Sequence, residues 1–185
     1  MTVVRRTRKG GFTLVEIIIV VIILGILAAI VIPQFTSASQ DARKNSLSSQ
    51  LQTLRSQIEL YKLQHLDQLP QGLRTVGTQT PAIAWNEMIN KTNAAGTVST
   101  GSDYPFGPYL QTEPSNPLNG AKGVLVVSVD QVGGTAASGG TFTTADGFIL
   151  NNTNGKIWGS SKGVSGAAPG FVYDESLPSN PNNDL

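Results

Sequence analysis

Cysteine is absent from this chain of 185 residues, and histidine occurs once, at His65. The absence of cysteine excludes disulfides, thiolate nucleophiles and cysteine-based zinc sites. A lone histidine that continues an apolar helical stripe is a packing residue or a helix-end partner, because a metal site needs further ligands beside it. The sequence also lacks a serine–histidine–aspartate arrangement, a phosphate-binding loop and any motif that pairs two carboxylates. We therefore expect a protein that is not an enzyme and that needs no cofactor.

Charged residues are few, at 14% of the chain, and they are unevenly placed. Residues 1–11 hold four of the thirteen basic residues and none of the twelve acidic ones. The remaining chain therefore has more acidic than basic side chains, and it offers no basic surface for nucleic acid. Basic residues beside an apolar segment usually stay cytoplasmic, which places the chain after that segment across the membrane. The four residues are Arg5, Arg6, Arg8 and Lys9.

One long apolar run, residues 17–32, holds much of the hydrophobic content of 39%. A helix over residues 12–33 would be roughly 32 Å long at 1.5 Å per residue, which is enough to span a bilayer. Glu16 stands at the entrance to this run, where an unpaired carboxylate is costly, so it is a functional candidate that needs a cationic partner. The partner that we infer is the amine that a cut between Gly11 and Phe12 would create.

Two other interpretations of the N-terminus remain open. A secretory signal peptide would have its cleavage site at residues 37–39, Ser-Ala-Ser, but the apolar run is longer than the usual ~7–15 residues. A membrane anchor that stays uncut accounts for the length of the run. It does not account for the string at residues 10–16, Gly-Gly-Phe-Thr-Leu-Val-Glu.

This string and the apolar run behind it resemble the N-termini of type IV pilins and of the pseudopilins of type II secretion systems. The resemblance covers residues 10–33 and is strongest at the string itself. It implies that a membrane-embedded prepilin peptidase removes residues 1–11 as a leader and methylates the new amine of Phe12. It also implies that Glu16 meets the amine of an incoming subunit during self-assembly. Gly25 and Pro33 would mark a break or kink in the helix.

The family resemblance implies a structural role, most directly as a subunit of a type II secretion pseudopilus that drives protein export. A surface pilus subunit for adhesion, motility or DNA uptake is the alternative within the family. An uncut, membrane-anchored extracytoplasmic binding module is the alternative outside it. We expect a single pass through the bacterial inner membrane, with the C-terminal domain extracytoplasmic, before assembly into a periplasmic or cell-surface filament. The expected partners are the peptidase, further copies of the chain, minor pilins or pseudopilins and an inner-membrane assembly platform.

Residues 34–69 are predicted to continue the helix with an amphipathic pattern that ends at Pro70. Apolar residues recur at alternating intervals of four and three, which places them on one helical face. His65 continues the same stripe. A face of this kind must be covered by later parts of the chain. The stripe consists of Leu47, Leu51, Leu54, Ile58 and Tyr61.

Residues 70–185 are predicted to form a globular head with an irregular connection, a short helix over residues 82–91 and about three strands. Residues 107–110, Gly-Pro-Tyr-Leu, look like the linker that precedes the sheet in major pseudopilins. We place strands at residues 123–129, 147–150 and 156–158, with a turn at Asn154-Gly155 between the last two. The predicted fold class is α+β and type IV pilin-like, with a long N-terminal helix packed against a small antiparallel sheet.

The tail from residue 163 to the C-terminus is rich in proline, glycine and asparagine, and we expect it to be flexible. Some related pseudopilins bind calcium in a loop near the sheet, and calcium prefers oxygen ligands. Asp174, Glu175 and Asp184 are weak candidates for such ligands. Apart from these residues we expect no metal site.

Overall fold

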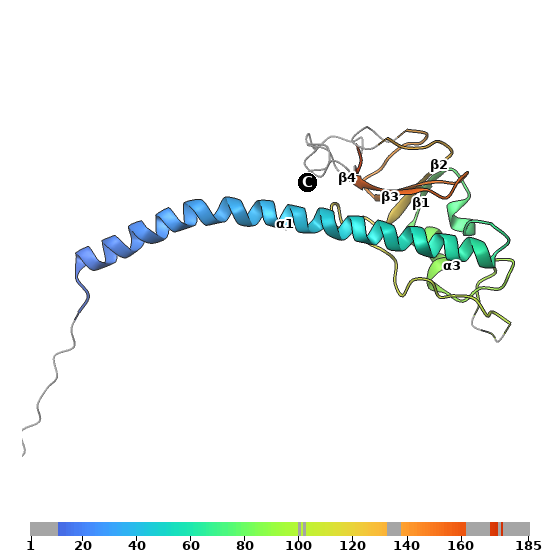
Figure 1. Ribbon diagram of the computed structural model, residues 1–185, viewed down its shortest axis with the longest axis horizontal. Helices are drawn as coiled ribbons and strands as arrows, with labels where there is room; N and C mark the ends of the chain where they lie inside the picture. The colour runs from blue at the N-terminus through green and yellow to red at the C-terminus, as the bar shows by residue number, and fades with distance from the viewer. Residues whose placement is uncertain are drawn as a thin grey trace, which may run out of the picture. The chain divides into compact units, whose positions relative to one another are not determined.

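The computed structural model describes residues 11–99, 101, 103–132, 138–161, 171–173 and 175 (Figure 1). The chain divides into two compact units, one that ends at Ser39 and one that begins at Gln40. The helix α1, Leu14–Gln64, runs through the first unit and into the second. The second unit adds the short helices η1 (Gln71–Leu73), α2 (Pro81–Ala84) and α3 (Asn86–Ile89), and the strands β1 (Gly77–Gln79), β2 (Gly123–Val127), β3 (Asp146–Asn151), β4 (Ile157–Ser161) and β5 (Phe171–Val172).

The amphipathic half of α1 forms the main core of the second unit, as its stripe predicted. All five stripe residues are at most 1% exposed, and they pack against the facing side of the sheet. Burial of one large aliphatic side chain contributes roughly 1.5–3 kcal/mol, so the stripe accounts for much of the attachment between helix and sheet. Figure 1 shows β3 and β4 lying along this part of α1. The contacting sheet residues are Val124, Val126, Phe148, Leu150 and Ile157.

The helix ends at Gln64, earlier than the end at Pro70 that the sequence predicted. The backbone turns at Leu66 and Asp67, which have φ angles of 56° and 60°. The amide of Asp67 donates to the carbonyl of Lys62 at 2.8 Å, which is the bond of a Schellman-type helix end. The prediction was wrong because this motif usually has glycine at its left-handed position, and here leucine occupies it.

The sheet contains five strands in the order β1-β2-β3-β4-β5, and it is mixed rather than antiparallel. β2 and β3 run parallel, while the other three neighbouring pairs are antiparallel. The predicted all-antiparallel pairing is therefore wrong at β2 and β3. The connection at residues 128–145 is longer than the dozen residues that a parallel crossover needs, so it returns the chain to the same end of the sheet.

Both faces of the central strands are covered. Alternate residues of β2 and β3 point away from α1 and form a second apolar cluster with Val172 of β5. The partly buried Trp158 packs against this cluster. The α+β class and the helix-on-sheet arrangement are thus confirmed, with an extra strand at each edge. The second cluster consists of Leu125, Val127, Ile149 and Val172.

His65 has the packing role that the sequence predicted. It is 2% exposed, and its ring stacks on Tyr61 with 3.8 Å between centroids. Nδ1 lies 2.8 Å from the Tyr61 carbonyl, which can only accept, so this nitrogen carries the proton. Nε2 then accepts from the hydroxyl of Thr92 at 3.0 Å. Both ring nitrogens are therefore occupied within the protein.

Candidate functional site

The candidate site is the start of α1, where the helix begins one residue after Thr13. The amide of Glu16 donates to Oγ1 of Thr13 at 3.2 Å, and the amide of Thr13 donates to Oε2 of Glu16 at 3.4 Å. This reciprocal pair is a capping box, which satisfies two amides that the first turn leaves unpaired. This role was not predicted from the sequence, although the Thr-x-x-Glu spacing is its signal.

The capping box does not depend on whether the leader is present. A cut between Gly11 and Phe12 leaves the amide of Thr13 intact, because that amide belongs to the next peptide bond. The new ammonium of Phe12 would lie one residue before the N-cap, close in sequence to the carboxylate of Glu16. The carboxylate of Glu16 can therefore cap the helix of its own chain and still form an ion pair with a cation.

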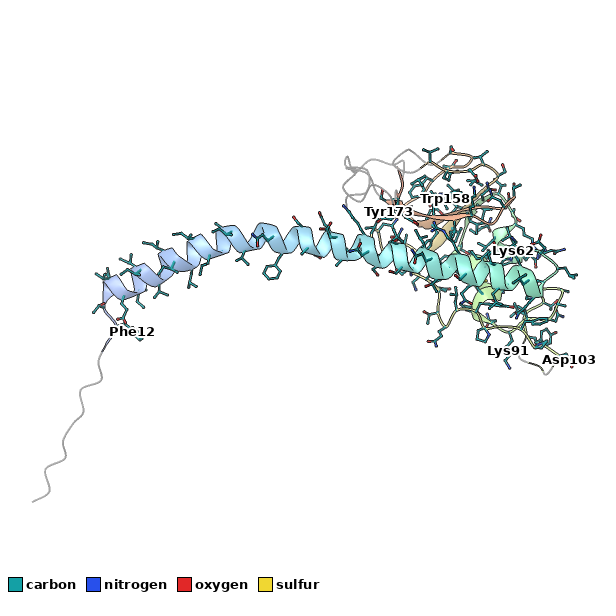
Figure 2. All side chains as sticks on the ribbon, viewed as in Figure 1. Phe12, Lys62, Lys91, Asp103, Trp158 and Tyr173 are labelled. Atoms are coloured by element: carbon teal, nitrogen blue, oxygen red, sulfur yellow. The ribbon has the colours of Figure 1, made fainter. Side chains whose placement is uncertain are left out.

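The peptide bond between Gly11 and Phe12 is accessible in the described structure. Phe12 is 80% exposed, and a side-chain carbon at Gly11 would meet no atom within 4 Å. Figure 2 shows Phe12 at the beginning of the α1 ribbon, with its side chain directed away from the helix. Nothing in the described residues would need to move for a peptidase to reach this bond in extended form.

Glu16 is favourably placed with respect to the helix, and no cationic side chain of the described residues forms an ion pair with it. It is the acidic residue of the first turn, where the partial positive charge of the helix N-terminus stabilises a carboxylate. Among residues 11–99 and the later described segments, no ion pair includes Glu16. Its carboxylate thus remains available for a cation from outside.

The apolar half of α1 is uncovered along its whole length. The large side chains from Ile17 to Ile32 are between 40% and 64% exposed. The helix is long and apolar enough to cross a membrane, and none of its most apolar 18-residue window is buried. An apolar surface of this size on one chain requires lipid or other helices around it.

Gly25 and Pro33 do not interrupt α1, which is helical across both positions. A side-chain carbon at Gly25 would meet no atom within 4 Å, so the residue is free of tertiary packing in the single chain. The predicted break or kink at these two residues stays a prediction about an assembled state.

The calcium candidates are only partly described. Asp174 and Asp184 lie outside the described residues. The carboxylate of Glu175 accepts from both terminal nitrogens of Arg55, at 2.8 and 3.1 Å. In the part of the chain that the structure describes, no three metal-ligating side chains gather in one place. Calcium binding by the tail therefore stays a prediction.

Comparisons with known proteins agree with this site. The family model for the prokaryotic N-terminal methylation motif matches residues 6–32, which contain the predicted cut, Glu16 and the uncovered helix. These observations define the class: the chain has an N-terminal methylation motif on a helix that is long and apolar enough to cross a membrane, and a pilin-like α+β fold. Within this class, its relatives are the G-type pseudopilins of type II secretion systems.

The relatives carry the name type II secretion system core protein G. The protein of Pseudomonas aeruginosa is 41% identical over 59 residues, which are 32% of this chain and 42% of the relative. The Klebsiella pneumoniae protein is 29% identical over 60% of this chain and 69% of its own length. The Vibrio cholerae protein is 27% identical over 75% of this chain and 90% of its own length. No solved structure matches the chain significantly.

The match to the Pseudomonas protein spans less than half of that relative, and the match to the Dickeya chrysanthemi protein spans 37% of it. The strongest similarity therefore lies in a part of the molecule rather than in the whole. The role that the names of these relatives state therefore supports a proposal about this chain.

Proposed function

We propose that the protein is a structural subunit of a type II secretion pseudopilus. The observation that carries this proposal is the start of α1. There an accessible Gly11-Phe12 bond, a Glu16 without an ion pair to any described residue, and an uncovered apolar helix follow one another within the matched motif. A prepilin peptidase removes residues 1–11 and methylates Phe12. The processed helices then pack together and cover the apolar surface that one chain leaves exposed.

Glu16 guides this assembly by charge. In a low-dielectric surrounding, an ammonium or a carboxylate alone has a desolvation penalty of several kcal/mol, whereas the two together largely compensate each other. The carboxylate of Glu16 in the growing filament pairs with the ammonium of Phe12 on the incoming subunit. A subunit in the wrong axial position leaves both charges unpaired, so the pair selects the register.

The N-terminal basic residues place the leader in the cytoplasm and the globular unit on the extracytoplasmic side. The working partners are further copies of the chain, companion minor pseudopilins and an inner-membrane assembly platform. This role is structural and requires no catalytic group or cofactor in the chain. A surface pilus with the same processing would serve adhesion, motility or DNA uptake. Whether protein export in the host depends on this chain distinguishes the secretion role from the surface pilus role.

The N-terminal mass of the protein tests the proposal. We expect chains from sheared extracellular filaments to begin at Phe12 and to be heavier by one methyl group. Chains from a peptidase-deficient strain should retain the leader and remain in the membrane. An intact chain in sheared material, or a chain confined to membranes of the normal strain, would contradict the proposal and favour an uncut anchor.

A further inference from the structure

A polar cavity of about 440 Å³ lies where three segments of the second unit meet. They are the turn after α1, the residue that follows η1 and the turn between β3 and β4. The volume falls within the range of small-ligand sites, roughly 300–1,000 Å³. Lys62, which lies in the last turn of α1 and is labelled in Figure 2, lines the cavity. The lining residues that matter for binding are Lys62, Asp67, Arg74, Asn152, Thr153 and Asn154.

Arg74 is held in place and yet keeps the end of its guanidinium free. Its Nε donates to the carbonyl of Leu69, and its own carbonyl accepts from Nδ2 of Asn152 at 2.7 Å. In the described ranges, neither terminal nitrogen of Arg74 has a hydrogen bond or an ion pair. Two adjacent terminal nitrogens form a fork that matches the two oxygens of a carboxylate.

The other cation of the cavity is already neutralised. Nζ of Lys62 lies 3.3 Å from Glu59 and 3.5 Å from Asp67. Among the described residues, the positive charge left to pair with a ligand is therefore that of the Arg74 guanidinium, which matches a singly charged anion better than a doubly charged one.

The turn between β3 and β4 also lines the cavity, and it is held in a fixed shape. The amides of Thr153 and Gly155 donate to Asn151, both at 2.8 Å, which holds the turn in shape. The hydroxyl of Thr153 has no hydrogen bond with any residue that the structure describes, so it can donate to a ligand.

We propose that this cavity binds a carboxylate group, with the terminal nitrogens of Arg74 as the main donors and the Thr153 hydroxyl as a second. The carboxylate belongs either to a small monocarboxylic acid or to an acidic side chain of a peptide. Binding takes place on the globular unit and does not depend on filament formation, so failure of either proposal leaves the other intact.

The test is a titration of the isotope-labelled full chain in detergent micelles, followed by amide chemical shifts. The probes are propionate and the peptide acetyl-Gly-Glu-Gly-amide, with chloride at equal ionic strength as the reference. We expect saturable shifts confined to residues 67–74 and 152–155. Tighter binding of the peptide assigns the site to acidic side chains, and tighter binding of propionate assigns it to small acids. Shifts that chloride reproduces, or no saturation with either probe, would overturn the proposal.

Four variants sharpen the test. Arg74→Gln should weaken binding at least about tenfold, because the fork is lost. Arg43→Gln removes an exposed arginine outside the cavity lining and should bind like the wild type. Asp67→Asn should tighten binding about two- to fivefold, since it removes the nearby negative charge.

Thr153→Val leaves Arg74 and its hydrogen bonds in place. It therefore tests the site independently if Arg74→Gln disturbs the fold. We expect about threefold weaker binding, because one donor is lost. Unchanged affinity in both Arg74→Gln and Thr153→Val would overturn the assignment of the site.

Discussion

The two halves of α1 have the same secondary structure but opposite relations to the rest of the chain. From Ile17 to Ile32 the helix is apolar on all sides and wholly uncovered. From Leu47 to Tyr61 most apolar residues lie in one stripe, and that stripe is buried under the sheet of the same chain. An apolar stripe thus indicates a partner within the chain, whereas a helix that is apolar all round indicates lipid or further copies.

The largest expected effect comes from the same substitution in each half. Leu51→Ala removes a fully buried side chain from the core and should lower the free energy of unfolding of the globular unit by about 2–5 kcal/mol. Leu24→Ala, at a residue that is 59% exposed, should leave that free energy unchanged. Chemical denaturation of the full chain in detergent, followed by the fluorescence of Trp85 and Trp158, measures both. Equal losses for the two variants would break the comparison.

A smaller effect is expected where the second half of α1 ends. Leu66 has a φ of 56° and is 82% exposed, so its side chain contributes strain without core packing. Leu66→Gly should raise the free energy of unfolding by up to about 1 kcal/mol, because glycine adopts this conformation without steric cost. Leu63→Gly is the control, since the exposed Leu63 lies inside the helix, and it should destabilise by a similar amount. Destabilisation by Leu66→Gly would contradict this account of the helix end.

The smallest effect is a pH dependence in the sheet that covers the second half. Hydrogen bonds from Lys156, Asn154 and Asn151 hold the pKa of Asp130 at about 2, below its ordinary value of 3.8. A lowered pKa in the folded state stabilises above pH 3.8, and this stabilisation is lost as the pH falls toward 2. Denaturation midpoints between pH 4 and pH 2 should therefore fall less steeply in Asp130→Asn than in the wild type. Parallel pH profiles would show that the Asp130 network has no such role.

Much of this architecture follows from local sequence. The stripe of α1, the three strands around residues 123–158 and the turn at Asn154-Gly155 are encoded by periodicity and by turn residues, and the structure confirms them. The short edge strands β1 and β5 were missed, because strands of two or three residues have no local pattern and depend on distant partners.

The parallel pairing of β2 and β3 has a signal in the sequence, although it was not predicted. Both strands read as unbroken apolar runs, Val-Leu-Val-Val and Phe-Ile-Leu, and such runs are typical of strands that are buried on both faces. At the candidate site, the residues were predicted from one string, but the capping role of Thr13 was not. The cavity at Arg74 could not be predicted, because its walls come from segments far apart in the sequence.

The central claim is that the charge of Glu16, rather than its capping bond, directs assembly. Glu16→Gln separates the two roles, since glutamine can keep the capping box while the charge is lost. Thr13→Val does the reverse, because it removes the capping hydroxyl, at a cost of about 0.5–2 kcal/mol to the helix start, and keeps the carboxylate.

The decisive measurement is the amount of sheared filament that each variant yields in a host with a working secretion system, alongside its N-terminal mass. We predict that Glu16→Gln is cut before Phe12 but yields at least about tenfold fewer filaments, because an unpaired ammonium costs several kcal/mol in the apolar filament core. Thr13→Val should retain most of its filaments. Normal filament yield from Glu16→Gln, with loss in Thr13→Val, would show that capping is the function of Glu16 and would contradict the account.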